Sequence, residues 1–555
     1  MDKKYEKLSK EELLGIIEKL ERRKKFGLIW DAEKVPEKVV QNCSKHLPVL
    51  KEVSDNEIKD KFSDINNILI EGDNFHSLST LNYTHYESID VIYIDPPYNT
   101  SNGEFLYNDK RIDKNDSFKH SKWLNFMEKR LKLAKNLLKI SGVIYISIAK
   151  EEFAQLKILC DEIFGEDNFI ENIIWRKKEG GGQQDDYYVT EHEYILMYAK
   201  RKGSFQLIEK ISKKETKYKY FDKKKQKWYN IVKLAKWGSS ALKEDRPTMH
   251  FPITAPDGND YLPLAPDGRL GRWRYGKLNV ERLIDEESIE WVKKGNSWLP
   301  YERCYDEGPA QQILKQRSIF YDYGTTADGT KELTDIFGLK DIFPNPKPTE
   351  LIQEILIQSC PNDGIILDFF AGSGTTAHAV LKLNKLDNGK RKFILCTNNE
   401  ENICSKITYP RIKKIINGYT NKKKEKRLPL GSNLKYFKTD FVKNSINKDQ
   451  LKIDLTKKCS EMLCLKEDIF NLHKEAEDYK IFSEKNKTVA IYFNFISESL
   501  FDLIEDLKRI NNFKKLYCFT LDPRGLDESL FDEVKDLEIE AIPHKMLEIY
   551  KQIFN

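Results

Sequence analysis

Residues 90–100 read Asp-Val-Ile-Tyr-Ile-Asp-Pro-Pro-Tyr-Asn-Thr, and this stretch decides how the rest of the chain is interpreted. Residues 91–94 are apolar and mostly β-branched, a pattern that predicts a buried strand. Two prolines follow Asp95, and because proline has no backbone N–H they end the hydrogen-bonded ladder of the strand. We therefore expect the Asp95 carboxylate at the C-terminal end of a buried strand, where open α/β sheets bind their ligands.

The two prolines also restrict the geometry around this carboxylate. Each proline fixes its own φ at about −65°, and a residue that precedes a proline adopts an extended conformation. The carbonyl groups of Asp95 and Pro96 should therefore point in set directions, with the ring of Tyr98 beside them. The alternative interpretation is a strand that simply ends in a polyproline-like surface turn.

Such a site suits an amino group attached to a planar base. The exocyclic amine of adenine becomes cationic as it takes an alkyl group, so acceptors for its N–H bonds would stabilise the charge where it develops. Asp95 and the carbonyl group of Pro96 would be these acceptors, and Tyr98 would stack on the base.

A second motif lies far downstream, after a predicted strand at 365–370. It reads Asp-Phe-Phe-Ala-Gly-Ser-Gly-Thr-Thr from residue 368 to residue 376. Gly372 and Gly374 allow the backbone to approach a ligand where a Cβ would clash. A helix that begins near Thr375 would offer N–H groups to a carboxylate. Gly-x-Gly alone is a weak signal, but here the required strand precedes it and a helix follows.

Asp95-Pro96-Pro97-Tyr98, taken together with this glycine motif, resembles the amino-methyltransferase family of DNA-modifying enzymes. The catalytic motif precedes the cofactor motif, an order that resembles the β-group, and the chain is similar to Mod subunits of type III restriction-modification systems. The resemblance implies that Asp95, Pro96, Pro97 and Tyr98 catalyse methyl transfer from S-adenosyl-L-methionine to N6 of an adenine flipped out of a specific DNA sequence. Two alternatives stay open: N4-methylation of cytosine, which the family pattern makes less favoured because residue 95 is Asp rather than Ser, and a noncatalytic DNA-binding specificity subunit.

The resemblance also implies which residues bind the cofactor: Asp73, Lys347, Asp368, Phe369, Phe370, Ala371, Gly372, Ser373, Gly374 and Thr375. Asp73 would contact the adenine end of the cofactor, although an Asp that opens a helix serves equally well as its N-cap. Lys347 likewise has a capping role as its alternative. Many relatives carry an acidic ribose ligand after the next strand, but here residues 397–399 are Thr-Asn-Asn and the first acid is Glu400. The ribose contact is therefore left unassigned.

Alternating strand and helix patterns predict an α/β fold, a doubly wound and mostly parallel sheet of the Rossmann-like methyltransferase type. Its first half has predicted strands at 68–70, 91–94, 143–148, 173–175 and 194–198, with Gly142 expected to end the helix at 123–138. We expect an N-terminal helical segment (1–60), the catalytic half of the methyltransferase domain (61–202), a target-recognition insertion (203–330), the cofactor-binding half (331–425) and a C-terminal α/β accessory domain (426–555).

Residues 210–236 contain eleven lysines against two acidic residues, with aromatic residues between them. A plain charge run is usually a solvated face, but lysines interrupted by aromatic rings suit phosphate contacts combined with base stacking. The predicted DNA-binding residues in this insertion are Lys217, Lys219, Lys224, Lys227, Trp228, Arg272 and Arg274.

Bulk properties limit the remaining possibilities. A chain of 555 residues exceeds one core, and its net charge of +5 is small enough that any nucleic-acid surface must be local. Nine scattered cysteines without a Cys-x-x-Cys pair predict reduced thiols and no metal site. Reduced thiols are typical of a cytoplasmic protein, and the absence of an 18-residue apolar run predicts that the chain does not span a membrane.

The partners follow from the resemblance and from one missing motif. Double-stranded DNA and a second copy of the chain, in a homodimer, are the partners that the resemblance implies. The chain has no Gly-x-x-x-x-Gly-Lys-[Ser/Thr] segment. An ATP-dependent restriction nuclease, if one accompanies this protein, must therefore be a separate subunit.

Two smaller features carry predictions of their own. Ser9 and Glu12 fit a capping box that would begin a helix near the N-terminus. His192, which precedes the strand at 194–198, is a candidate base or metal ligand, with a structural polar role as the alternative.

Overall fold

The computed structural model describes residues 9–10, 12–15, 37–100, 106–107, 110–111, 118–180, 187–213, 218–295, 297–306, 311–445, 447–484, 486–494, 498–521 and 528–554. The chain divides into two compact units. The first unit comprises Met1–Ile208 and Arg317–Asn555, and the second unit comprises Glu209–Gln316. The second unit thus falls within the predicted insertion at 203–330.

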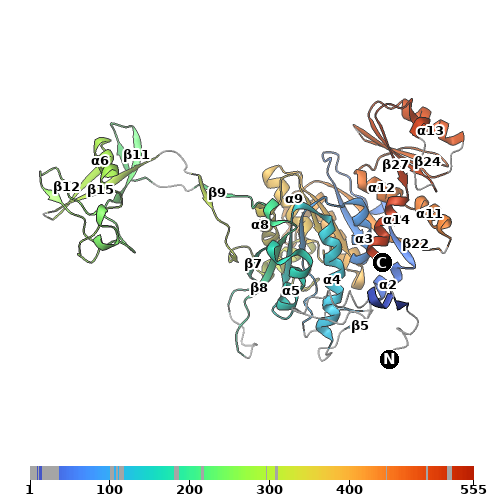
Figure 1. Ribbon diagram of the computed structural model, residues 1–555, viewed down its shortest axis with the longest axis horizontal. Coiled ribbons are helices and arrows are strands. Elements are labelled where there is room, and N and C mark those ends of the chain that lie inside the picture. Colours follow the sequence, from blue (N-terminus) through green and yellow to red (C-terminus); the bar gives the residue numbers. More distant parts are fainter. Residues whose placement is uncertain are drawn as a thin grey trace. The chain divides into compact units, whose positions relative to one another are not determined.

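A ten-stranded sheet forms the centre of the first unit (Figure 1). Six of its nine neighbouring strand pairs are parallel, so the prediction of a mostly parallel sheet is confirmed, and antiparallel pairs lie toward both edges. The strands, in spatial order, are β1 (His46–Glu52), β22 (Asn433–Lys443), β2 (Asn66–Glu71), β19 (Lys392–Thr397), β18 (Ile365–Asp368), β3 (Ile89–Ile94), β6 (Leu138–Ile148), β8 (His192–Ala199), β7 (Phe169–Arg176) and β17 (Ile319–Phe320).

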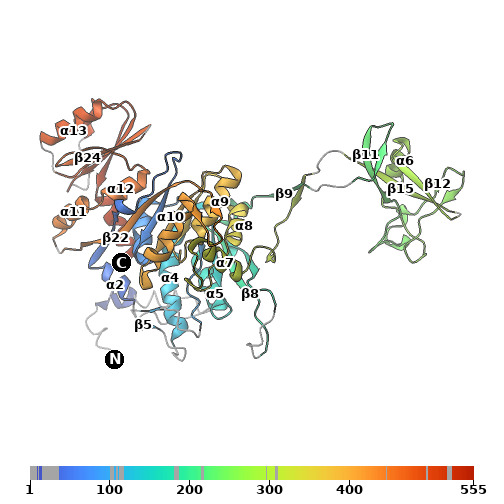
Figure 2. The same ribbon diagram turned by 180° about the vertical axis from the view of Figure 1, so that it is seen from behind.

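Helices cover both faces of this sheet (Figure 2), which explains why every residue of the central strand β3 is buried. Successive residues of a strand point to opposite faces, and accordingly Ile92 and Ile94 of β3 belong to one core while Val91 and Tyr93 belong to the other. The first core contains residues of α3 (Asn74–Thr84), α4 (Lys119–Leu137) and α5 (Phe153–Phe164). The second contains residues of α7 (Thr326–Phe337), α8 (Thr349–Ser359), α9 (Thr375–Asp387) and α10 (Tyr409–Asn417).

The prediction that Gly142 ends a helix is wrong. Helix α4 ends at Leu137 and β6 begins at the next residue, so Gly142 lies inside the strand. The register between β3 and β6 shifts at this point. A Cβ at Gly142 would lie 2.8 Å from the carbonyl oxygen of Ile89, so the glycine permits the close approach of two backbones in an irregular stretch of the ladder.

The C-terminal part of the first unit contains a separate five-stranded sheet that packs onto the central domain. Helix α14 (His544–Phe554) contacts β1 of the ten-stranded sheet through Tyr550, whose hydroxyl donates to the carbonyl group of Pro48. The strands are β23 (Leu472–Glu475), β24 (Tyr479–Glu484), β25 (Lys487–Tyr492), β26 (Phe513–Phe519) and β27 (Leu537–Ile542), and the helices are α11 (Lys448–Lys457), α12 (Ser460–Glu467), α13 (Glu498–Lys508) and α14 (His544–Phe554).

The second unit is built around a four-stranded sheet with a small core of its own, which includes Leu234, Trp273 and Val280. The strands of this sheet are β10 (Tyr220–Asp222), β11 (Lys227–Lys233), β15 (Ser297–Tyr305) and β14 (Ile289–Lys294), and the helix α6 (Lys277–Asp285) accompanies them. The pairs β12 (Ile253–Thr254) with β13 (Asp260–Tyr261) and β9 (Lys210–Lys213) with β16 (Gln311–Leu314) complete the unit.

Three further observations concern the chain as a whole. The capping box is confirmed, because the backbone N–H of Ser9 donates to Glu12 and that of Glu12 donates to Ser9; residues 16–36 of the predicted N-terminal segment lie outside the described residues. All nine cysteines are free. None of the helices in the described ranges has both the length and the apolar character needed to cross a membrane.

Candidate active site

A cavity of about 1050 Å³ opens at the carboxyl ends of five neighbouring strands. Ligand sites in proteins commonly occupy about 300–1,000 Å³, so this cavity has room for a large ligand or for two smaller ones. The residues that follow β2, β19, β18, β3 and β6 line it, among them Asp73, Asn398, Phe369, Asp95 and Ala149. This is the edge of the sheet where the sequence predicted a site.

The backbone of the Asp95 motif is fixed from two sides. The indole N–H of Trp123 in α4 donates to the carbonyl group of Pro97 over 2.7 Å. Asn99 has a left-handed φ of 55° and donates to the buried carboxylate of Glu152 over 2.5 Å. These contacts hold the turn so that Asp95, Pro96, Pro97 and Tyr98 all line the cavity.

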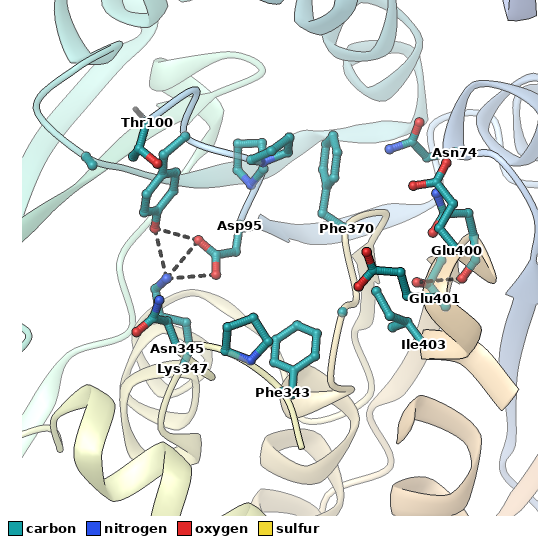
Figure 3. Close-up of a pocket in the computed structure, with 18 of the residues that line it drawn as sticks. Asn74, Asp95, Thr100, Phe343, Asn345, Lys347, Phe370, Glu400, Glu401 and Ile403 are labelled. Carbon is teal, nitrogen blue, oxygen red and sulfur yellow. Dashed lines mark hydrogen bonds and ion pairs between the residues drawn. The ribbon is translucent and has the colours of Figure 1, made fainter. Parts of the chain in front are cut away.

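Lys347 lies directly on the Asp95 carboxylate (Figure 3). Its Nζ is 2.8 Å from Oδ1 and 2.7 Å from Oδ2 of Asp95, and it also donates to the hydroxyl of Tyr98 over 2.8 Å. Burial by itself lowers the pKa of Lys347, but the carboxylates of Asp95 and Glu193 outweigh burial and raise it. The lysine is therefore a charged partner of the predicted catalytic residue.

The loop that carries Lys347 is held by close packing. A Cβ at Gly329 in α7 would lie 2.2 Å from the carbonyl oxygen of Pro346. The hydroxyl of Thr375 donates to the carbonyl group of Lys347 over 3.2 Å. The position of Lys347 beside Asp95 is thus supported by α7 and by the first turn of α9.

Glu193, at the start of β8, is a site residue that the sequence reasoning missed. Its Oε2 accepts from the Tyr98 hydroxyl over 3.1 Å and lies 3.4 Å from Lys347, while its Oε1 is 3.1 Å from Nζ of Lys177. Burial opposes ionisation, but Lys347 and Lys177 together bring the pKa of Glu193 below its usual value. Burial and then the carboxylates of Asp95 and Glu193 raise the pKa of Tyr98, so its hydroxyl stays protonated.

The preceding residue, His192, points elsewhere. Its Nε2 hydrogen-bonds with the Tyr194 hydroxyl at 3.1 Å, and it does not line the cavity. His192 and Glu193 are neighbours on a strand and therefore face opposite sides of the sheet. No signal in the sequence distinguished Glu193 from His192, because β8 is buried on both faces from Ile195 onward.

The glycine motif forms a tight loop around Asp368. One oxygen of this buried carboxylate accepts from the backbone N–H of Phe370 over 3.0 Å, and the other accepts from the hydroxyl of Thr376 over 2.6 Å. Gly372 and Gly374 both have left-handed φ values, 47° and 78°, which glycine adopts without strain.

The structure separates the predicted cofactor residues of this loop into two groups. Phe369, Phe370 and Gly372 line the cavity. The other residues of the loop are buried and do not line the cavity. On this buried side Arg411 donates to the hydroxyl groups of Ser373 and Thr375. The members of this buried group are Asp368, Ala371, Ser373, Gly374 and Thr375.

Asp368 gives this loop a pH-dependent stability. Burial raises the pKa of its carboxyl to about 7, from an ordinary 3.8. The folded state therefore keeps the proton that the unfolded chain loses, and this stabilising contribution is complete below about pH 4 and is lost as the pH rises through about 7. Asp368→Asn should remove a penalty on the order of 4 kcal/mol at pH 8. Thermal unfolding at pH 5 and pH 8 is the measurement, and the variant should gain melting temperature relative to the unmodified protein as the pH rises.

The matched control is Asp363→Asn, which changes an exposed carboxylate in the same part of the chain. Its melting temperature should follow that of the unmodified protein at both pH values. Parallel pH curves for Asp368→Asn and the unmodified protein would show that Asp368 is ionised in the folded state.

At the opposite end of the cavity from Asp95 and Lys347 lie Asn74, Glu400 and Glu401 (Figure 3). Phe370 and Phe343 lie between the two ends. The cavity is therefore lined by acidic and amide side chains at one end, by aromatic rings in the middle and by the Asp95 network at the other end.

Asp73 is the N-cap of α3, because its carboxylate accepts from the backbone N–H of Phe75 over 2.7 Å. This confirms the capping interpretation, and its contact with a cofactor stays a prediction. Asn74 donates to the carbonyl group of Phe369 over 3.1 Å. Both residues contact the buried guanidinium of Arg130, which also forms a two-point ion pair with Glu37. Arg130 is a second residue that sequence reasoning missed.

The predicted DNA-binding residues of the second unit have different environments. Lys217 lies outside the described residues. Lys219 and Lys227 are exposed, and Trp228 is 51% exposed beside Phe221. The others are engaged within the unit: Lys224 pairs with Glu287, Arg274 pairs with Glu302, and the buried Arg272 donates to the carbonyl group of Ser240.

Residues 89–409, which hold both motifs and the cavity between them, match the sequence model of a family described as DNA methylase, of the N6/N4 kind. The match spans more than half of the 555 residues, so the chain belongs to this family. The resemblance inferred from Asp95-Pro96-Pro97-Tyr98 and the glycine motif is thereby confirmed.

Three relatives share about a third of their aligned residues with this chain. The StyLTI Mod subunit of a type III restriction-modification enzyme, from Salmonella typhimurium, is 35% identical over 60% of this chain and 52% of its own length. The EcoPI Mod subunit from Escherichia phage P1 is 34% identical over 60% of this chain and 58% of its own. The type II methyltransferase M.KpnI from Klebsiella pneumoniae is 37% identical over 61% of this chain and 82% of its own length. The chain thus spans about half the length of the two Mod subunits.

Among solved structures, TTHA0409 from Thermus thermophilus is described as a putative DNA modification methylase complexed with S-adenosyl-L-methionine. It is 15% identical to this chain and covers 60% of it and 89% of its own length, with a TM-score of 0.28.

Proposed function

We propose that this protein transfers a methyl group from S-adenosyl-L-methionine to N6 of an adenine within a specific sequence of double-stranded DNA, as the Mod subunit of a type III restriction-modification system. The observation that carries the proposal is the Asp95 carboxylate, which lies at the end of a buried strand, in a cavity large enough for a cofactor and a base. Membership of the N6/N4 DNA methylase family and the similarity to Mod subunits support the same reaction.

The side chains that line the cavity fit S-adenosyl-L-methionine. Carboxylates of Glu400 and Glu401 suit ribose hydroxyls, since carboxylate oxygens accept hydrogen bonds from hydroxyl groups. Asn74 and Asp73 suit an adenine amino group at the same end. Phe370 and Phe343 offer apolar surface in the middle. Glu400 and Glu401 would thus replace the acidic residue that relatives place directly after the strand.

The cofactor supplies an electrophilic methyl group on a sulfonium sulfur, and the chain supplies the groups that bind and orient the amine. The target base must leave the duplex to reach the cavity. Asp95 and the carbonyl group of Pro96 would accept the two N–H bonds of the adenine amine and stabilise its positive charge as the C–N bond forms and the C–S bond breaks. The cationic amine would then pass one proton to water by way of the Asp95 carboxylate, and the neutral product would bind Asp95 less strongly.

The test is to incubate the full chain with radiolabelled S-adenosyl-L-methionine and unmethylated bacterial DNA, and to identify the labelled nucleoside by chromatography and mass spectrometry. The proposal requires label in N6-methyladenine. Label in N4-methylcytosine would move the assignment to the other reaction of the family. Absence of both labelled nucleosides and of cofactor binding would favour a noncatalytic specificity subunit.

We further propose that the second unit recognises the target sequence, as the insertion of a β-group enzyme, and that the protein acts as a homodimer with a separate ATP-dependent restriction subunit. The exposed Lys219, Lys227 and Trp228 support the DNA contact.

Binding of a DNA duplex, followed by fluorescence anisotropy at several salt concentrations, tests the DNA contact. Lys227→Ala should lower the slope of log affinity against log salt by about 1. Trp228→Ala should weaken binding by about 1–3 kcal/mol if its ring stacks on a base. Arg272→Lys serves as the comparison, since Arg272 is buried and any effect would come through the fold of the unit. Unchanged affinity and salt slope in the first two variants would exclude this surface.

A further inference from the structure

The ion pair between Lys347 and Asp95 opposes the proposed reaction. Lys347 contacts both oxygens of the Asp95 carboxylate, which must accept a hydrogen bond from the adenine amine. Its positive charge lies next to the position where the amine becomes cationic, and like charges at such distances repel strongly in a poorly hydrated site. For Asp95 to act, the charge of Lys347 must be drawn away from it or balanced.

The Glu193 carboxylate is placed to do this. One of its oxygens already lies 3.4 Å from Nζ of Lys347, and a charge-assisted hydrogen bond has a length of about 2.7–2.9 Å. A movement of Nζ of Lys347 by less than about 1 Å would therefore complete a hydrogen bond with Glu193 and lengthen the contacts with Asp95. The Tyr98 hydroxyl contacts all three groups, with distances of 2.5 Å to Asp95, 2.8 Å to Lys347 and 3.1 Å to Glu193.

The backbone around Glu193 keeps it in place. Glu193 is 8% exposed and belongs to β8, where it pairs with Trp175 of β7. The ring of Trp175 lies 5.8 Å from Nζ of Lys347, and Lys177 contacts the far oxygen of Glu193. Lys347 is thus enclosed between the strands β7 and β8 and the loop that carries Asp95.

The charges of this cluster balance only when Glu193 is present. Asp95 and Glu193 contribute two negative charges, and Lys347 and Lys177 contribute two positive charges. Replacement of Glu193 by a neutral residue leaves a net positive charge beside the reacting amine. It also removes the second carboxylate that competes for Lys347, which strengthens the ion pair with Asp95 that blocks the amine.

We propose that Glu193 is a positioning residue for methyl transfer, which accepts the ion pair of Lys347 when the amine of the target base engages Asp95. The inference rests on the proposed function. It assigns to Lys347 two positions, one on Asp95 when the base is absent and one on Glu193 when the base is bound. Glu193 contacts neither the base nor the methyl group and acts through Lys347 and Tyr98.

The experiment compares Glu193→Gln with Glu191→Gln in the full chain. Glu191 undergoes the same change of charge two residues earlier, and its backbone carbonyl group, which the substitution leaves in place, accepts from the N–H of Lys177 over 2.8 Å. Glu193→Gln should lower kcat for methyl transfer by about 10- to 100-fold, since one preorganised charge is lost. It should leave the affinity for S-adenosylhomocysteine unchanged. Glu191→Gln should resemble the unmodified protein in both measurements.

A double-mutant cycle separates this role from a merely structural one. If Glu193 acts by drawing Lys347 away from Asp95, then Glu193→Gln should cause no further loss of kcat in a Lys347→Met background. Glu193→Asp, which retains the charge, should recover part of the rate.

Three outcomes would overturn the inference: equal kcat values for Glu193→Gln and Glu191→Gln, independent losses of rate in the double-mutant cycle, and no recovery in Glu193→Asp although this variant binds S-adenosylhomocysteine normally. Absence of methyl transfer by the unmodified protein would be a different result, since it would refute the proposed function rather than the role of Glu193.

Discussion

Asp95→Ala should abolish methyl transfer while the protein keeps its fold and its affinity for S-adenosyl-L-methionine. The carboxylate is the group that stabilises the developing charge on the amine, and removal of one such preorganised group costs about 10²–10³ in rate. Asp95 is the central member of the network, so the loss should reach or exceed the upper end of that range. The measurement is single-turnover methyl transfer to unmethylated DNA.

The fold should survive this change because Lys347 keeps a carboxylate partner in Glu193. Asp55→Asn, at an exposed position, is the control for the removal of a carboxylate. Full activity of Asp95→Ala would refute the assignment of the catalytic residue. Loss of cofactor affinity together with activity would instead place Asp95 in the cofactor site.

The parts of the site that lie within one contiguous stretch were predictable from the sequence. An apolar strand followed by Asp-Pro-Pro fixes the place of Asp95 by local rules alone, since the strand must be buried and the prolines must end it. The same holds for Gly372 and Gly374, whose left-handed backbone requires glycine. The positions of the strands in the first half of the sheet also followed from short apolar runs.

The network around Asp95 could not be predicted, because it joins residues that only the closed sheet brings together. Lys347 follows Asp95 by 252 positions and Glu193 follows Tyr98 by 95. A sequence pattern shows that a strand alternates between two faces, but it does not show which face borders the cavity. The sequence therefore indicated His192 as a candidate base or metal ligand, although the adjacent Glu193 is the residue that lines the site.

The lysine-rich stretch of the second unit also shows what a sequence pattern cannot predict. The number of lysines predicted a basic surface, but the sequence does not record which of them have acidic partners. Lys224 and Arg274 pair with Glu287 and Glu302, whereas Lys227 and Trp228 lie exposed on β11. Exposure depends on how strands pair, and this pairing is a property of the folded unit.

Arg130→Ala should destabilise the first unit and weaken cofactor binding at the same time. The guanidinium of Arg130 is completely buried and forms a two-point ion pair with Glu37, with distances of 2.7 and 3.0 Å. It also contacts Asp73 at 3.3 Å and stacks on the ring of Phe126 at 3.7 Å. Removal of one partner from a buried pair leaves an uncompensated charge and costs about 3–5 kcal/mol.

This cost should appear as a fall in melting temperature of about 3–5 °C in a unit of this size, measured beside Arg201→Ala, which removes an exposed arginine from the same unit. Cofactor affinity should fall as well, since Asp73 and Phe126 both line the cavity. Arg130→Met combined with Glu37→Gln should recover part of the stability, because a neutral pair avoids the buried unpaired carboxylate. If Arg130→Ala melts at the same temperature as Arg201→Ala and binds the cofactor normally, then the ion pair with Glu37 does not support this wall of the cavity, and Asp73 is held by its capping hydrogen bond alone.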